Sequence, residues 1–167
     1  VVGKAADNTL IKKYETVKYD KYQDIDNFHS LLECDFIFIA VPTPFNCDKD
    51  EVDQSAIIES LEKLEKLKYD GIVIIKSTIP PGTCESYSKI YGFDIVFNPE
   101  FLRESTTPNE DFAYQETVVI GSTSKLVFNK VKSMFSKVLV PHAQYYHTSM
   151  GEAEMIKTAQ NTMLASR

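Results

Sequence analysis

Basic residues are outnumbered by acidic ones in this 167-residue sequence, cysteine is scarce, and long apolar runs are missing. The formal net charge of −6 argues against a nucleic-acid partner, because phosphate backbones bind basic surfaces. No apolar run approaches the roughly 20 residues that a membrane-spanning helix needs, and no signal-peptide pattern opens the chain. We therefore expect a cytoplasmic protein that binds neither nucleic acid nor a membrane.

The cysteines Cys34, Cys47 and Cys84 are odd in number and lack the spacing of metal ligands. Neither a disulfide framework nor a metal site is therefore expected. With 43% hydrophobic residues, the chain can bury one hydrophobic core, so we expect a single domain or slightly more.

Helical and strand-like patterns alternate along the chain. The run Phe36–Val41 is apolar on both faces, which is typical of a strand buried in a parallel sheet. The alternation predicts an α/β fold with a doubly wound parallel sheet covered by helices on both faces. The predicted helices are 4–14, 27–33, 53–66, one that begins near 81, 125–135 and 151–167, and the predicted strands are 16–19, 36–41, 72–75, 95–97, 117–121 and 138–140.

Both ends of the chain read as interrupted elements. The opening Val-Val-Gly-Lys-Ala-Ala is typical of a glycine-rich turn that runs into a helix, so we expect a first strand to precede Val1. The last helical pattern has no capping glycine or proline, so we expect it to continue past Arg167.

Gly3 and Asp20 are spaced as in a dinucleotide-binding fold. There the third glycine of the phosphate loop allows close packing of helix and strand, and an acidic residue about 20 positions on binds the ribose hydroxyls. Asp20 ends the predicted strand 16–19 and is placed for that role. An ordinary turn residue is the alternative.

Polar motifs follow two predicted strands, at the sheet edge where α/β proteins bind ligands. In Val41-Pro-Thr-Pro44 the prolines fix the backbone, so Thr43 is expected to face the crevice. In Lys76-Ser-Thr-Ile-Pro-Pro-Gly-Thr83 the Thr78 hydroxyl can hold a water or a substrate oxygen. A rigid turn and a helix cap are the alternative interpretations.

The motif Asn98-Pro-Glu-Phe-Leu-Arg-Glu104 concentrates two carboxylates, an amide and a guanidinium. If a helical turn begins at Pro99, Glu100 and Glu104 share one face, where their repulsion raises one pKa and creates a general base. The alternative is an exposed acidic turn with Arg103 as its counter-ion.

Glu154, Lys157 and Asn161 form one stripe of the last predicted helix. Spacing alone favours a salt bridge between Glu154 and a neighbouring lysine.

Taken in order, these strings resemble the UDP-glucose/GDP-mannose dehydrogenase family. The likeness runs from Gly3 to Arg167 through Val-Pro-Thr-Pro, Lys-Ser-Thr-Ile-Pro-Pro-Gly-Thr, Asn-Pro-Glu-Phe-Leu-Arg-Glu and Glu-Ala-Glu-Met-Ile-Lys, with Asn161 following. This family oxidises the primary alcohol of a nucleotide sugar to a carboxylate in two NAD-dependent steps, through a cysteine-bound thiohemiacetal and thioester. The resemblance implies a Rossmann-like NAD-binding domain over 1–148 and the start of a central dimerisation helix over 149–167, without the sugar-nucleotide domain.

The resemblance also implies a role for each matched residue. The residues implied to contact NAD are Gly3, Asp20, Val41, Pro42, Thr43, Thr78 and Glu104. Those implied to contact the sugar nucleotide are Phe101, Leu102, Lys157 and Asn161. The implied catalytic residues have three kinds of role. Thr78 positions a water, Glu100 lies near that water and Glu104 serves the hydrolytic step. Lys157 and Asn161 stabilise oxyanion charge.

The sequence departs from the family in one respect, because the nucleophilic cysteine lies beyond the central helix. Cys84, at a predicted helix N-terminus where a thiol pKa falls, does not match it. We therefore expect this chain to be part of a homodimeric UDP-glucose 6-dehydrogenase and to be inactive on its own. GDP-mannose or UDP-N-acetylmannosamine as substrate, another hydroxy-acid dehydrogenase, and a non-catalytic nucleotide-binding module remain alternatives.

Overall fold

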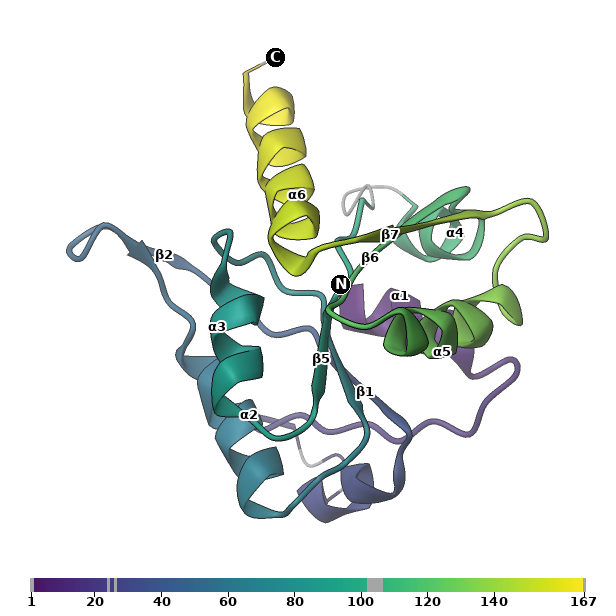
Figure 1. Ribbon diagram of the computed structural model, residues 1–167, viewed down its shortest axis with the longest axis horizontal. Helices are drawn as coiled ribbons and strands as arrows, with labels where there is room; N and C mark the ends of the chain where they lie inside the picture. Colours follow the sequence, from purple (N-terminus) through teal and green to yellow (C-terminus); the bar gives the residue numbers. More distant parts are fainter. Residues whose placement is uncertain (1, 24, 26, 102–106, 167) are drawn as a thin grey trace.

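The computed structural model describes residues 2–23, 25, 27–101 and 107–166. Five strands form one sheet in the order β1-β4-β5-β6-β7, and helices lie on both of its faces (Figure 1). The fold is therefore Rossmann-like, as predicted. The strands of this sheet are β1 Phe36–Ile39, β4 Ile72–Ile75, β5 Asp94–Phe97, β6 Thr117–Gly121 and β7 Gln144–Thr148, and a separate hairpin joins β2 Phe45–Asn46 to β3 Glu51–Val52.

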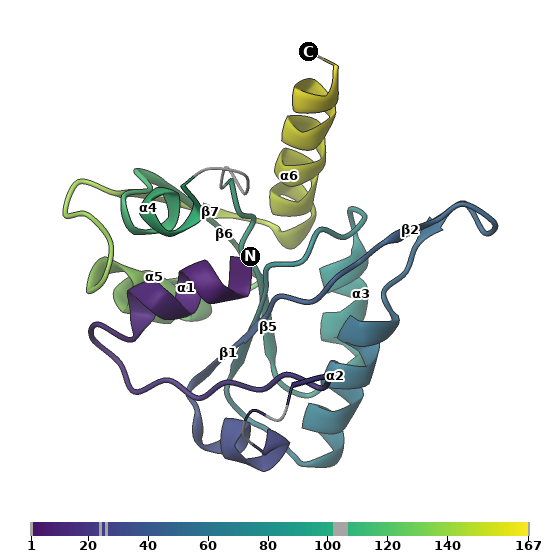
Figure 2. The ribbon, with the colours of Figure 1, turned by 180° about the vertical axis from the view of Figure 1, so that it is seen from behind.

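A hydrophobic core lies on each face of the sheet. Val73 and Ile75 of β4 belong to the core under α2 Ser55–Lys66 and α3 Thr83–Ile90. Ile72 and Ile74, which alternate with them, belong to the opposite core. Figure 2 shows this second face, covered by α1 Val2–Leu10 and α5 Lys125–Ser136. Because all four β4 side chains are buried, the strand is apolar throughout, as a central parallel strand should be.

The sheet is not parallel throughout, which corrects the prediction. β1, β4 and β5 are parallel to one another and β6 is parallel to β7, but β5 and β6 are antiparallel through the pair Phe97 and Gly121. After β5 the chain passes through α4 Pro108–Ala113 before β6 begins. β6 therefore runs back toward the carboxyl end of β5 and meets it there.

Two predicted strands are absent, although all their residues are described. Residues 16–19 form no ladder, and beside them Asp20 makes only an isolated bridge with Ile25. Residues 138–140 instead close α5, since Val138 N and Leu139 N both donate to Phe135 O. The strand lies further on, at β7, whose Tyr-Tyr-His-Thr run favours extended backbone.

The helix boundaries differ less from the prediction. The helix predicted over 4–14 ends at Leu10, and turns follow it. The segment predicted as a helix over 27–33 is the 3₁₀ helix η1 Phe28–Glu33, capped by Asn27. The helices expected over 53–66, 125–135 and 151–167 are α2, α5 and α6 Met150–Ala165.

Helix α6 is anchored at its start and projects from the body at its end (Figures 1 and 2). A capping box between Ser149 and Glu152 begins it. At Gly121 a Cβ would lie 2.7 Å from Ala153 Cβ and 2.9 Å from Met150 Cα, so only glycine lets α6 pack this closely on β6. In the part of the chain that the structure describes, no helix is long and apolar enough to cross a bilayer.

Candidate functional site

The loops that follow β1 and β4 are tied together by side-chain hydrogen bonds. The Ser77 hydroxyl accepts from Val41 N at 2.9 Å and donates to Val41 O at 2.7 Å. The Thr43 hydroxyl donates to Thr78 O at 2.7 Å, while the Thr78 side chain itself is exposed. The structure therefore brings together the first two predicted motifs and leaves the Thr78 hydroxyl accessible.

A buried ion pair joins the motifs that follow β4 and β5. Lys76 Nζ lies 2.7 Å from Glu100 Oε2 and donates to Asn98 Oδ1 at 2.6 Å. Asn98 Nδ2 donates to Val119 O of β6, which fixes the orientation of the amide. The Lys76 and Glu100 side chains are 1% and 4% exposed, so this ammonium and this carboxylate neutralise each other away from water.

The helical turn predicted from Pro99 is not observed at the described residues 99–101. The buried lysine partner also excludes the alternative of a solvent-exposed acidic turn for Glu100. Leu102, Arg103 and Glu104 lie outside the described residues.

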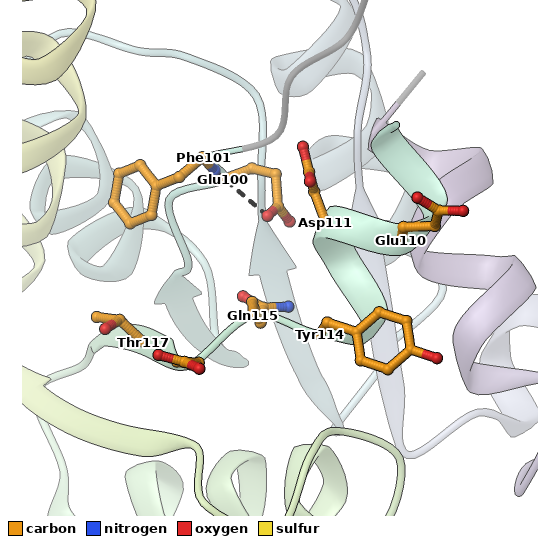
Figure 3. A pocket seen from close by; sticks show the side chains of 8 residues that line it. Glu100, Phe101, Glu110, Asp111, Tyr114, Gln115 and Thr117 are labelled. Carbon is orange, nitrogen blue, oxygen red and sulfur yellow. Dashed lines mark hydrogen bonds between the residues drawn. The ribbon is translucent and has the colours of Figure 1, made fainter. Parts of the chain in front are cut away.

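Glu100 and Phe101 line a cavity of about 610 Å³ together with α4 and the start of β6 (Figure 3). Phe101 N donates to Glu100 Oε1 at 3.3 Å. Thr43 and Thr78 do not line this cavity. The two threonines and Glu100 therefore do not share this cavity. The other lining residues are Glu110, Asp111, Tyr114, Gln115, Glu116 and Thr117.

Lys157 of α6 reaches the same motif from another direction. Its Nζ donates to the backbone carbonyl of Glu100 at 2.5 Å and lies 5.9 Å from the centroid of the Phe101 ring. Asn161, one turn further along α6, is exposed. The structure therefore brings Lys157 and Glu100 together.

Glu154 makes a contact with α3 that the sequence analysis missed. It is fully buried, and its carboxylate accepts from Gly82 N at 2.5 Å and Cys84 N at 2.7 Å, at the start of α3. The expected salt bridge with a neighbouring lysine is therefore wrong. Its helical phase with the packed residues Met150 and Ala153 was the available signal.

The same contact changes the expectation for Cys84. Burial, and then the facing Glu154 carboxylate, raise the pKa of the Cys84 thiol. The helix N-terminus does not lower the pKa, because a carboxylate already accepts from its amides.

Gly3 makes a close contact between helix and strand, whereas Asp20 lies in a turn. A Cβ at Gly3 would lie 3.3 Å from Ala40 Cβ, so α1 packs closely on the segment that follows β1. Asp20 ends no strand, and its carboxylate accepts from Tyr22 N at 2.9 Å and Gln23 Nε2 at 3.1 Å. The Asp20 carboxylate therefore makes the local contacts of a turn in this structure.

Parallel strands that end in polar loops, together with a glycine-mediated contact between helix and strand, define a Rossmann-like dinucleotide-binding domain. Residues 4–139 match the UDP-glucose/GDP-mannose dehydrogenase family, NAD binding domain, and the chain belongs to this family. NAD is accordingly its cofactor, and the close contact at Gly3 fits a dinucleotide.

Relatives of known identity support the assignment. Over 153 residues the chain is 31% identical to a UDP-glucose 6-dehydrogenase of Rickettsia felis, covering 88% of this chain and 34% of the relative. A UDP-glucose dehydrogenase structure from Pyrobaculum islandicum matches with a TM-score of 0.69 at 29% identity, covering 83% and 34%. A GDP-mannose dehydrogenase structure from Pseudomonas aeruginosa has the same TM-score of 0.69 at 26% identity, covering 83% and 34%. The chain spans about a third of the length of these relatives.

Proposed function

We propose that this chain is the cofactor-binding part of an NAD-dependent dehydrogenase that oxidises the primary alcohol of a nucleotide sugar to a uronic acid, with UDP-glucose as the substrate. The observation that carries the proposal is the hydrogen bond from Lys157 Nζ to the carbonyl of Glu100. It joins two motifs that lie 57 residues apart and that the family resemblance assigns to one reaction. Residues 1–148 are the NAD-binding domain of the proposal, and 149–167 begin its central helix.

The proposed roles follow from where the side chains lie. NAD supplies the hydride acceptor when it is bound, and Gly3 and the 41–43 loop would hold it. The exposed hydroxyl of Thr78 would orient a water. The Lys157 ammonium would stabilise oxyanion charge that develops near Glu100. Asn161, Phe101, Asp20 and the residues outside the described ranges, Leu102 and Glu104, keep the roles that the resemblance implies.

None of the three cysteines suits a covalent step. Cys84 is fully buried with a raised thiol pKa, and burial also raises the pKa of the Cys34 thiol. Cys47 is exposed in the turn between β2 and β3. The proposal therefore places the nucleophile outside these 167 residues and predicts that they do not turn over alone.

Self-association through α6 is part of the same proposal. Helix α6 exposes large apolar side chains that a second copy would cover. These residues are Met155, Ile156, Met163 and Leu164.

The test compares residues 1–167 with the complete product of the open reading frame that contains them. Each protein is assayed for NADH formation with UDP-glucose, GDP-mannose and UDP-N-acetylmannosamine. We expect the complete protein to reduce two NAD per UDP-glucose, and residues 1–167 to bind NAD in calorimetry without forming NADH.

Two outcomes would contradict the proposal. One is steady NADH formation by residues 1–167 alone, and the other is inactivity of the complete protein with all three sugars. Faster turnover of GDP-mannose would identify the second candidate substrate, which we include because a GDP-mannose dehydrogenase structure matches this chain with a TM-score of 0.69.

A further inference from the structure

We propose that Lys76 is a positioning residue for Glu100 and that its ammonium holds the Glu100 carboxylate at the wall of the cavity. This inference rests on the proposed function, in which Glu100 acts beside the reacting sugar. Lys76 is the first residue after β4, and Glu100 is the third residue after β5. The two neighbouring parallel strands therefore set the separation of the two side chains.

The geometry leaves the ammonium little freedom. Its two oxygen partners, Asn98 Oδ1 and Glu100 Oε2, lie at 2.6 and 2.7 Å. The centroids of the Phe112 and Phe135 rings lie 5.2 and 6.0 Å from Nζ, so apolar walls face the remaining part of the charge. Lys76 thus holds its charge beside the Glu100 carboxylate at a fixed point.

The surroundings of Glu100 explain why a fixed cation is useful. Glu110, Asp111 and Glu116 line the same cavity and bring three further carboxylates to its walls. Like charges repel, so a Glu100 side chain without a cation would turn away from these carboxylates. The Lys76 ammonium opposes this movement.

Lys76 and Lys157 bind different atoms of Glu100. Lys157 donates to its backbone carbonyl from α6, whereas Lys76 pairs with its carboxylate from the end of β4. Lys157 therefore places the backbone of the residue and Lys76 places its reactive group.

A buried ion pair of this kind contributes little net stability, because desolvation of both charges offsets their attraction. The pair instead fixes the orientation of the Glu100 carboxylate, and a double-mutant cycle in the complete protein can measure this effect.

The cycle contains Lys76→Gln, Glu100→Gln and the double variant. Lys76→Gln keeps an N–H donor for Asn98 without the charge, and Lys76→Met is made as a second variant that removes the donor as well. Lys89→Met is the matched control, since Lys89 and Glu85 form a solvent-exposed pair at 3.1 Å.

We expect folded Lys76 variants to lose about 10- to 100-fold in kcat, a share of what a positioned acid or base contributes. KM for NAD and for the sugar nucleotide should stay within about twofold, because uniform binding is untouched. On the Glu100→Gln background the Lys76 substitutions should change kcat by less than about twofold, because they act through Glu100. Lys89→Met should keep the kcat of the parent.

The inference is overturned if folded Lys76→Gln keeps the parent kcat, or if its loss multiplies with that of Glu100→Gln. If the parent protein oxidises no nucleotide sugar, the proposed function fails, and a crystal structure of Lys76→Gln within residues 1–167 still decides the inference. A Glu100 carboxylate that leaves its place beside residue 76 supports it, and one that stays there refutes it.

Discussion

At the scale of single residues, the buried pair of Lys76 and Glu100 makes each charge depend on the other. Both side chains are nearly inaccessible to water, at 1% and 4% exposure. Removing one partner leaves the other charge buried and without its counter-ion, which is far more costly than losing the pair as a whole. The stability of the domain is therefore sensitive to either substitution alone.

The first prediction follows for the stability of residues 1–167. Lys76→Met should lower the free energy of unfolding by about 3–5 kcal/mol, and the additional substitution Glu100→Gln should restore most of it. Urea unfolding monitored by circular dichroism measures both values. A Lys76→Met protein within about 1 kcal/mol of the parent would show that the pair is not desolvated as described.

The second prediction concerns the reactivity of Cys84. Its raised thiol pKa and complete burial predict that it reacts with a disulfide reagent at neutral pH far more slowly than the exposed Cys47. Glu154→Gln removes the carboxylate that helps to raise this pKa and should speed the reaction of Cys84. Peptide mass spectrometry of labelled protein assigns each rate to its cysteine.

The control for this experiment is Glu152→Gln, which removes an exposed carboxylate from the same helix. It should leave the rate at Cys84 unchanged. Equal rates at Cys84 in the parent and Glu154→Gln proteins would contradict the electrostatic contribution of Glu154.

At the scale of elements, α6 is held by contacts with three different segments. Its first turn packs on β6 at Gly121, Glu154 accepts from the start of α3, and Lys157 donates to the loop after β5. The position of one helix therefore fixes two of the loops that form the candidate site.

The third prediction tests this arrangement with a single methyl group. At Gly121 a Cβ would meet Ala153 Cβ at 2.7 Å, Met150 Cα at 2.9 Å and Ser149 O at 3.0 Å, and two of these three are backbone atoms. Gly121→Ala should therefore displace α6 and lower the free energy of unfolding by about 1–3 kcal/mol. Hydrogen exchange at the amides of Gly82 and Cys84 should accelerate, since they donate to Glu154.

Gly151→Ala is the matched control within α6. A Cβ at Gly151 would have nothing within 4 Å, so this change should stabilise the helix by about 0.5–1 kcal/mol. Slow exchange at Gly82 and Cys84 in Gly121→Ala would show that the close packing of α6 does not support the start of α3.

The elements also show what could be predicted from the sequence. β4 and β6 match the expected ranges 72–75 and 117–121, because each is a local apolar run. β7 was missed because its Gln-Tyr-Tyr-His-Thr run is half polar and the apolar Val-Leu-Val before it resembled a strand. The pattern at residues 16–19 likewise gave no information on whether a neighbouring strand would pair with it.

The candidate site was predictable only in part, for a related reason. Thr43, Thr78 and Glu100 were chosen because they follow strands, and strand ends are defined locally. The partners of Glu100 come from β4 and α6, and the partners of Glu154 come from α3, so they depend on tertiary packing. Spacing along the chain contains no such information.

At the scale of the whole molecule, several buried ionisable groups have raised pKa values. Burial raises the pKa of the Tyr87 phenol from 10.0 to about 12, and burial with Glu154 raises that of the Cys84 thiol above 9.0. Tyr69 and Cys34 shift in the same direction. All four groups keep their protons in the folded state at pH values where the unfolded chain releases them.

The fourth prediction is a loss of stability in alkaline solution. Because the folded pKa values are raised, these groups have their full stabilising effect below the unfolded thiol pKa of 9.0 and lose it as the pH rises toward 12. The urea midpoint should thus be level between about pH 7 and 9 and fall above that. Cys84→Ala should make the first part of the fall shallower, and a midpoint that stays constant to about pH 11 would contradict the prediction.

The exposed end of α6 is far from its anchors, and this has a mechanical consequence. Glu154 and Lys157 lie one turn apart and contact the start of α3 and the loop after β5, while the turns beyond them project from the body of the protein. Because an α-helix is stiff, a force on the exposed end of α6 is transmitted to the contacts of Glu154 and Lys157. We expect a partner that binds the exposed end of α6 to move the Gly82 amide and the Glu100 carbonyl together.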